Sequence, residues 1–175
     1  MITFRGIEID FMKDEDIPAV QEIEKVSFSS PWPDNSFDNE LHHNRVACYL
    51  VAKYEGKVIG YCGGWIIMDE VHITSVAVKP EFRGKKIGEQ LIWQLLSVSL
   101  EKGARWSTLE VREGNDAAIK LYEKFGFVKV GTRKAYYDYR DNAIVMWAGN
   151  LQGEGFRKKI EEIEKDFLTP PEKES

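Results

Sequence analysis

A short basic turn offers the first chemistry that can be recognised in this sequence. It stands between an apolar run, HITSVAV, and a helical pattern, EQLIWQLL. The first turn of a helix has unpaired backbone N–H groups and partial positive charge, so a basic turn that feeds it suits a phosphate. The same residues would also suit a solvent-exposed turn that does no more than precede a surface helix. The turn is made of Phe82, Arg83, Gly84, Lys85, Lys86, Ile87 and Gly88.

The turn does not match the common nucleotide-binding loops. It lacks the Walker pattern GxxxxGK followed by Ser or Thr, and it lacks the dinucleotide pattern GxGxxG. A nucleotide-dependent enzyme is therefore the most remote interpretation of the basic residues.

A second stretch, LEVREGNDAAIKLYEKFGF, combines a carboxylate, a capping residue and a phenol. Glu110 lies on the polar face of a strand whose Leu109 and Val111 point the other way. Asn115 suits the N-cap of the helix that follows. Tyr122 falls on the apolar stripe of that helix, where a tyrosine is ordinarily a core residue. The spacing alone leaves structural roles open for both Asn115 and Tyr122.

The cysteines and histidines do not form a metal-binding pattern. Cys48 and Cys62 lie in apolar, strand-like runs, which indicates small buried hydrophobes in a reducing compartment. His42, His43 and His72 have no metal-ligand spacing to a cysteine. We therefore expect no metal site and no disulfide.

The composition is that of an ordinary folded domain. The 175 residues are 43% apolar and 30% charged, enough for one α/β or α+β domain with a sizeable core. A net charge of -5 argues against general attraction to nucleic acid. No apolar run approaches the ~18 residues of a membrane span, and the segment MITFRGIEIDF lacks the apolar core of a signal peptide. We expect a cytoplasmic protein that binds neither nucleic acid nor membrane.

Hydrophobic periodicity predicts strands and helices that could position these groups. The seven predicted strands span residues 6–12, two halves of 46–68 that turn at Glu55-Gly56, 71–78, 106–111, 127–137 and 142–149. The predicted helices follow a cap at residues 14–16, the break at Pro31 and Pro33, the turn at Ile87 and the cap at Asn115. A fifth, amphipathic helix has one apolar face formed by Phe156, Ile160, Ile163 and Phe167. We expect one domain, residues 1–150, and a C-terminal helix with a tail, residues 151–175.

The order of these elements and two of the motifs resemble the GNAT superfamily of acetyl-CoA-dependent N-acetyltransferases, over roughly residues 5 to 150. In the family's pyrophosphate loop, Arg/Gln-x-x-Gly-x-Gly/Ala, Arg83 and Gly88 match, and Lys86 takes the place of the middle glycine. A family signature, Asn-x-x-Ala-x-x-x-Tyr-x-x-x-Gly-Phe, matches at Asn115, Ala118, Tyr122, Gly126 and Phe127. The resemblance implies an α/β (α+β) GNAT fold with a mixed, mostly antiparallel sheet of about seven strands and about four helices, besides the extra C-terminal helix.

The resemblance also implies acetyl-CoA as cosubstrate. Backbone amides of the basic turn would hold its diphosphate, and a strand edge would hold the pantetheine arm and the oxyanion. Tyr122 would lie near the sulfur and protonate the departing thiolate, while Lys86 would either weaken the phosphate cradle or add a charge to it. The binding residues implied in this way are Val76, Ala77, Val78, Arg83, Gly84, Lys85, Lys86, Ile87, Gly88, Asn115 and Tyr122.

Three details resemble the protein N-terminal acetyltransferases within this family, namely the RimI-like ribosomal-protein alanine type and its archaeal relatives. One is Pro31-Trp32 in FSSPWPDNSFDNEL, one is LEVREGN with its catalytic glutamate at Glu110, and one is the tyrosine pair in RKAYYDYRDNAIVM. Strand propensity would by itself explain the tyrosines, and a helix stop with a packed indole would explain Pro31-Trp32. The acceptor-binding residues implied are Phe28, Pro31, Trp32, Tyr136 and Tyr137.

The implied reaction is direct transfer of acetyl to the N-terminal α-amino group of a protein, with a ribosomal protein among the possible substrates. A peptide α-amino group has a pKa of ~7.7–8.0 against ~10.4 for lysine, so a modest base suffices. Glu110 and His72, in the motif HITS, are the two candidate bases. A GNAT enzyme acting on a small amine, or a non-catalytic acyl-CoA-binding module, are the alternatives. The sequence does not separate a monomer from a homodimer.

Overall fold

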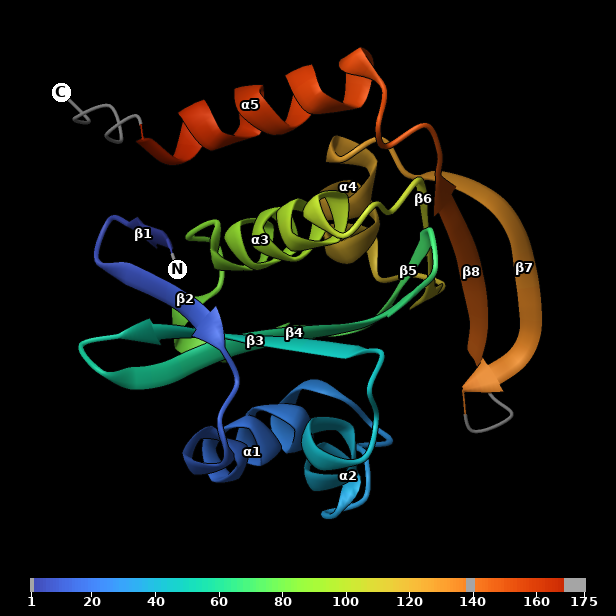
Figure 1. Ribbon diagram of the computed structural model, residues 1–175. Coiled ribbons are helices and arrows are strands. Elements are labelled where there is room, and N and C mark those ends of the chain that lie inside the picture. The colour runs from blue at the N-terminus through green and yellow to red at the C-terminus, as the bar shows by residue number, and fades with distance from the viewer. Residues whose placement is uncertain (1, 138–140, 169–175) are drawn as a thin grey trace, which may run out of the picture.

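A twisted sheet of eight strands runs through the computed structural model, with helices on both faces (Figure 1). The structure describes residues 2–137 and 141–168, with the side chains of residues 5–134 and 141–167. The strands are β1 (Ile2–Phe4), β2 (Ile7–Phe11), β3 (Ala47–Tyr54), β4 (Lys57–Ile67), β5 (Glu70–Val78), β6 (Trp106–Arg112), β7 (Val128–Tyr137) and β8 (Asp141–Ala148). They are arranged in the order β1-β2-β3-β4-β5-β6-β8-β7, and every neighbouring pair is antiparallel except β5 and β6. The predicted mixed, mostly antiparallel α/β sheet is confirmed.

The sheet has one strand more than the seven predicted. β1 is only three residues long and pairs with β2 through a turn at Arg5 and Gly6, both with positive φ. So short a strand carries no measurable hydrophobic periodicity, which is why the sequence pattern missed it.

Two helices cover one face of the sheet. These are α1 (Ile17–Ser27) and α2 (Ser36–His42), which lie below the sheet in Figure 1. Pro18 lies in the first turn of α1, where its missing N–H costs nothing. The core beneath these helices is aromatic, with the Phe37 ring edge-on to both Tyr49 and Tyr61. This core anchors the segment that joins the two helices.

Three helices lie on the opposite side of the sheet in Figure 1: α3 (Ile87–Glu101), α4 (Asp116–Lys124) and α5 (Glu154–Leu168). The predicted apolar face of α5 is buried in the same core as α3. The Trp93 indole of α3 also donates a hydrogen bond to the Ile160 carbonyl of α5, at 3.0 Å. The C-terminal helix therefore packs on the domain. The domain boundary at residue 150 stays a prediction.

The divergence of β5 and β6 positions the site. The two strands pair only from Glu70–Trp106 to Ile73–Leu109, after which β5 continues along β4 and β6 continues along β8. The register of β4 and β5 also shifts at this point, since Thr74 has no partner between the pairs of Gly63 and Gly64. The Tyr49 ring covers Gly63 so closely that a Cβ there would lie 2.1 Å from it, so glycine is required. The sheet thus opens where the two parallel strands end.

None of the helices in the described part of the chain is both long and apolar enough to cross a membrane.

Candidate active site

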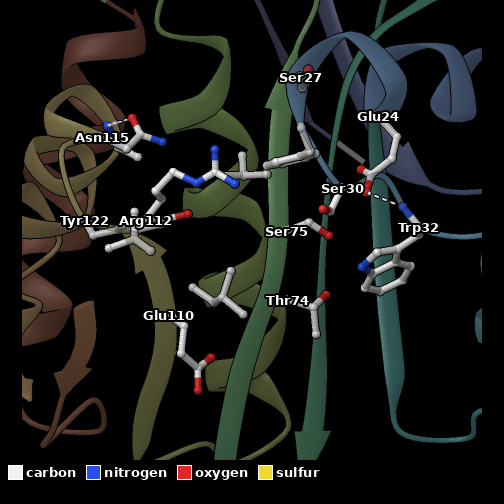
Figure 2. Close-up of a pocket in the computed structure, with 15 residues that line it drawn as sticks. Glu24, Ser27, Ser30, Trp32, Thr74, Ser75, Glu110, Arg112, Asn115 and Tyr122 are labelled. Carbon is white, nitrogen blue, oxygen red and sulfur yellow. Dashed lines mark hydrogen bonds between the residues drawn. The ribbon is translucent and has the colours of Figure 1, made fainter. Parts of the chain in front are cut away.

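A pocket of about 220 Å³ opens where β5 and β6 separate (Figure 2). One wall comes from β6 and α4, the floor from β5, and the other wall from the end of α1 and the segment after it. The lining residues are Glu24, Ser27, Phe28, Ser30, Trp32, Ile73, Thr74, Ser75, Val76, Glu110, Val111, Arg112, Asn115, Ala118 and Tyr122. The fold therefore brings together residues separated by almost one hundred positions of sequence.

A line of polar side chains leads to the pocket across β5 and β6. His72 Nε2 lies 3.2 Å from Glu110 Oε2, and His72 Nδ1 lies 3.0 Å from the hydroxyl of Thr108. That hydroxyl donates in turn to Glu70 Oε1 at 2.9 Å. His72 is opposite Thr108 in the parallel ladder, so the register of the sheet fixes this line. The structure thus places the two candidate bases, His72 and Glu110, in direct contact.

The surroundings of Glu110 favour its charged form. The hydrogen bond from His72 lowers the pKa of this carboxyl, and the charges of His72 and of Arg133, whose Nη2 is 3.8 Å from Oε1, lower it further. Partial burial acts in the opposite direction and is outweighed. Glu110 is therefore a carboxylate at neutral pH, held beside the pocket as a hydrogen-bond acceptor and weak base.

Asn115 and Tyr122 occupy the α4 wall of the pocket. The Asn115 side chain accepts a hydrogen bond from the Ala118 N–H at 3.3 Å, which makes Asn115 the N-cap of α4. Tyr122 is 5% exposed and its ring meets Phe127 edge-on at 5.9 Å. Asn115 therefore caps α4 and Tyr122 packs in the core, as their positions in the sequence predict, and both residues also line the pocket.

The segment between α1 and α2 forms the opposite wall. The Trp32 indole stacks on Phe37 at 5.5 Å and meets Tyr49 edge-on at 6.3 Å. Phe28 ends α1 and lines the pocket, whereas Pro31 is exposed and does not line it. The predicted acceptor residues Phe28 and Trp32 thus lie across the pocket from Glu110 and Tyr122. The side chains of Tyr136 and Tyr137 lie outside the described residues, and only their backbone, at the end of β7, is placed.

The basic turn leads into α3 in a conformation that normally selects glycine. Gly84 has φ +78°, and Lys86, the N-cap residue of α3, has φ 62° and ψ 21°, which is left-handed. The Gln90 N–H donates to the Lys86 carbonyl and begins the helix, so the N–H groups before it face outward as in any first turn. Glycine adopts this left-handed conformation without steric cost, and Lys86 adopts it here with a side chain.

Several predicted binding residues lie next to the pocket and not in it. Arg83 Nε donates to the Val78 carbonyl at 3.1 Å, which ties the basic turn to the end of β5. Lys85 Nζ lies 5.4 Å from the centre of the Phe82 ring. Of the predicted strand residues, Val76 lines the pocket, while Ala77 is buried in the core beneath α1 and α2. The described edge of β5 beyond Ile73 has no partner on β6.

Sequence reasoning missed several polar residues of the pocket wall, of which Glu24 is the most buried acidic one. Glu24 is only 4% exposed, and it accepts hydrogen bonds from the Tyr61 hydroxyl and, at 3.3 Å, from the Trp32 N–H. Burial raises the pKa of this carboxyl. A carboxylate at helical spacing within the apolar stripe of Val20 and Ile23 was the available signal.

Ser75 gave no comparable signal, and the alternation of the strand placed Arg112 only on the same face as Glu110. Figure 2 shows the Arg112 side chain extending from β6 into the pocket. Its Nη2 donates to the Ser29 hydroxyl at 2.7 Å. Its contact with the segment after α1 depends on tertiary structure alone.

One surface cluster in the described part of the chain brings three possible metal-ligand atoms within 4.8 Å of one another: Asp14, Asp38 and His42. His42 Nε2 lies 2.5 Å from Asp14 Oδ1 and 3.7 Å from Asp38 Oδ1, so the histidine is already in contact with both carboxylates. All three are exposed, and exposed acidic groups of this kind give no argument for a metal.

Comparison with known proteins agrees with this geometry. The model of the acetyltransferase (GNAT) family matches residues 17–127, which include α1, both diverging strands and the α4 wall. The chain belongs to the GNAT acetyltransferase family. A Bacillus subtilis protein provisionally named as a ribosomal protein bS18-alanine N-acetyltransferase is 48% identical over 137 residues, which cover 78% of this chain and 91% of the relative. The enzyme of that name from Escherichia coli K12 is 30% identical over 141 residues, 79% of this chain and 94% of the relative.

Solved structures of this GNAT family superpose on the chain. The crystal structure of the Escherichia coli ribosomal-protein-S18-alanine N-acetyltransferase has a TM-score of 0.76 at 28% identity and covers 82% of this chain and 94% of its own. Ard1 from Thermoplasma volcanium has a TM-score of 0.76 at 29% identity and covers 82% and 97%. The predictions of a GNAT fold, of an N-acetyltransferase and of a likeness to RimI-type and archaeal enzymes are confirmed. Family membership implies the use of acetyl-CoA.

Proposed function

We propose that this GNAT enzyme transfers acetyl from acetyl-CoA to the N-terminal α-amino group of a protein, with ribosomal protein bS18 as the expected substrate. The observation that carries the proposal is the pocket at the divergence of β5 and β6. It sets Glu110 and Tyr122 on one wall, opposite an acceptor wall formed by Phe28 and Trp32. The names of the Escherichia coli and Bacillus subtilis relatives support ribosomal protein bS18 as the target.

The residues around the pocket fit acetyl-CoA. The diphosphate would lie against the free N–H groups at the start of α3, with Arg83 and the two following lysines nearby. The pantetheine arm would pair with the open edge of β5 from Thr74 to Val78, and would also meet Asn115 of α4. Acetyl-CoA supplies the acetyl group as a thioester, and the oxyanion formed on attack would accept hydrogen bonds from backbone N–H groups of the same edge.

The protonation chemistry favours an α-amino group over lysine. At pH 7.4 roughly a quarter of peptide α-amino groups are neutral, against about one lysine in a thousand. A weak base suffices for the former, and Glu110 is one, since its pKa is lowered by the bond from His72. Glu110 would accept the proton that the amine loses once the new bond to carbon forms. Tyr122 would give its hydroxyl proton to the departing sulfur.

The test is a mass-spectrometric screen of synthetic N-terminal peptides with acetyl-CoA, in which the first two residues are varied and the bS18 N-terminal sequence is included. Each peptide is also supplied with its α-amino group blocked and a lysine free. We expect acetylation of the free α-amino group, with the bS18 peptide among the best substrates. A control panel of polyamines, amino sugars and free amino acids runs under the same conditions.

Acetylation of small amines with no peptide product would overturn the proposal in favour of a small-amine acetyltransferase. Binding of acetyl-CoA by calorimetry with no transfer to any amine would replace it with an acyl-CoA-binding module. Acetylation of a different protein N-terminus in preference to bS18 would retain the reaction and reject the substrate.

A further inference from the structure

Glu110, His72, Thr108 and Glu70 form a row of polar side chains in contact with one another. The hydroxyl of Thr108 and the carboxylate of Glu70 lie at the end of this row that is farther from the pocket. Neither lines the pocket, yet both are joined to it through His72. Thr108 stands on β6 directly beside His72 of β5, and Glu70 is two residues before His72 on the same strand. The three side chains therefore share one face of the sheet, the face that also presents Glu110.

The direction of these hydrogen bonds fixes where protons lie. A threonine hydroxyl has one proton, and Thr108 donates it to Glu70. Its oxygen is then an acceptor toward the imidazole, so His72 Nδ1 must carry a proton to make the 3.0 Å contact. If Nε2 carried none, its lone pair would face the Glu110 carboxylate at 3.2 Å, and both atoms would be acceptors. A proton therefore lies between Nε2 and Glu110.

Other aromatic and charged groups surround the His72 ring. The Trp65 ring lies opposite His72 in the β4–β5 ladder, 5.8 Å away at 33°, and its indole N–H donates to Glu40 at 2.7 Å. Arg133 brings a positive charge to Glu110 as well. Its Nη2 lies 3.8 Å from Glu110 Oε1, whereas His72 contacts the other oxygen, Oε2. The charged groups that face the ring directly or through one neighbour are thus Glu70, Glu110, Glu40 and Arg133.

We propose that Thr108 and Glu70 are positioning residues for catalysis, which hold His72 with its Nδ1–H directed at Thr108 and its Nε2–H directed at Glu110. The imidazole then gives Glu110 a donor, which keeps the carboxylate charged and aimed beside the pocket. This inference rests on the proposed acetylation of protein α-amino groups, and it adds two residues that the motifs do not contain.

Thr108→Val removes the hydroxyl with little change of shape, and Thr108→Ser restores it. We expect Thr108→Val to lower kcat on the acceptor peptide at least about tenfold, since a general base contributes about 10²–10⁴-fold. The KM for acetyl-CoA should stay within about twofold, because neither Thr108 nor Glu70 lines the pocket in which acetyl-CoA is proposed to bind. Thr108→Ser should recover most of the rate. Thr132→Val, at an exposed threonine of β7, is the matched control and should behave as wild type.

The pH profile separates positioning from a general loss of structure. Without its bond from a fixed His72, the Glu110 pKa should rise toward its ordinary value, so the acid limb of kcat/KM should move to higher pH in Thr108→Val. Glu70→Gln keeps an acceptor for the Thr108 hydroxyl and should retain more activity than Glu70→Leu, which removes the acceptor.

A readout that needs no acetyl transfer keeps this inference distinct from the proposed function. The chain has only three histidines, so the imidazole N–H signals can be assigned by ¹⁵N NMR with a His72→Gln variant. We expect a slowly exchanging Nδ1–H signal from His72 in wild type and Thr108→Ser, and its loss in Thr108→Val. Wild-type turnover in Thr108→Val, or an unchanged Nδ1–H signal, would overturn the positioning role. No peptide acetylation by wild type, with the signal behaving as expected, would instead reject the proposed function.

Discussion

Replacing Lys86 by glycine should stabilise the protein while weakening its hold on acetyl-CoA. Lys86 has φ 62° at the N-cap of α3, and this left-handed conformation costs a residue with a Cβ about 1–2 kcal/mol. Glycine avoids that cost but loses about 0.5–1 kcal/mol more chain entropy on folding. The net gain in the free energy of unfolding is about 0.5–1 kcal/mol, which for a chain of this size raises Tm by about 1–4 °C.

The same substitution removes a positive charge next to the proposed diphosphate site. An exposed charge of this kind contributes a modest attraction that salt screens, so acetyl-CoA affinity should fall about two- to fivefold at low salt. The difference between wild type and variant should shrink as salt rises. Thermal unfolding followed by circular dichroism measures the first effect, and calorimetric titration with acetyl-CoA at several salt concentrations measures the second.

Lys85→Gly is the matched control, because it removes the same charge from the same turn at a residue without positive φ. It should weaken acetyl-CoA binding similarly but should lower Tm, since glycine there adds chain entropy without relieving strain. If the two variants had the same Tm, the argument from backbone conformation would be wrong. If Lys86→Gly bound acetyl-CoA as tightly as wild type at every salt concentration, the added charge would have no role.

Further predictions concern the site and the last helix. Glu110→Gln and Tyr122→Phe should each reduce kcat on a peptide at least about tenfold while calorimetry still detects acetyl-CoA binding; wild-type rates would remove both from the mechanism. Because the Glu110 pKa is lowered in the folded state, its charge stabilises the protein above the ordinary value of ~4.3 and ceases to do so as pH falls through the lowered value. The stability advantage of wild type over Glu110→Gln, measured by urea unfolding, should therefore shrink at low pH. Ile163→Ala, which empties a buried site between α5 and the domain, should cost about 2–5 kcal/mol in the same assay, and a loss under about 0.5 kcal/mol would show that α5 docks weakly. The buried thiols of Cys48 and Cys62 have raised pKa values and should be dispensable, so Cys→Ala variants that fold but fail to acetylate would revive a thiol nucleophile.

Much of the fold could be predicted from local patterns. The alternation of Leu109, Glu110 and Val111 gave the two faces of β6 correctly, because a strand turns successive side chains to opposite sides. The stripe on α5 gave its buried face, since helical spacing brings residues three and four apart to one side. The strand β1 was missed because three residues carry no period, and it joins the sheet by pairing with β2.

The sequence by itself determined the chemical groups and the family. The basic turn before α3 and the Asn115–Phe127 signature are each contiguous in the sequence. They can therefore be recognised without any knowledge of the fold. The sequence also placed Lys86 where the family has glycine, but it could not say why glycine is favoured there. That reason is a backbone angle, and backbone angles of single turn residues depend on the elements that the turn connects.

Only the tertiary structure decided which groups meet. The contact of His72 with Glu110 depends on the parallel register of β5 and β6, which no local pattern fixes. The pocket exists because those two strands separate after Ile73, and Glu24 reaches it because α1 packs across the same end of the sheet. Local periodicity reports the environment of each residue along one element, whereas a site is made of distances between elements, and these are set by packing and strand pairing over the whole chain.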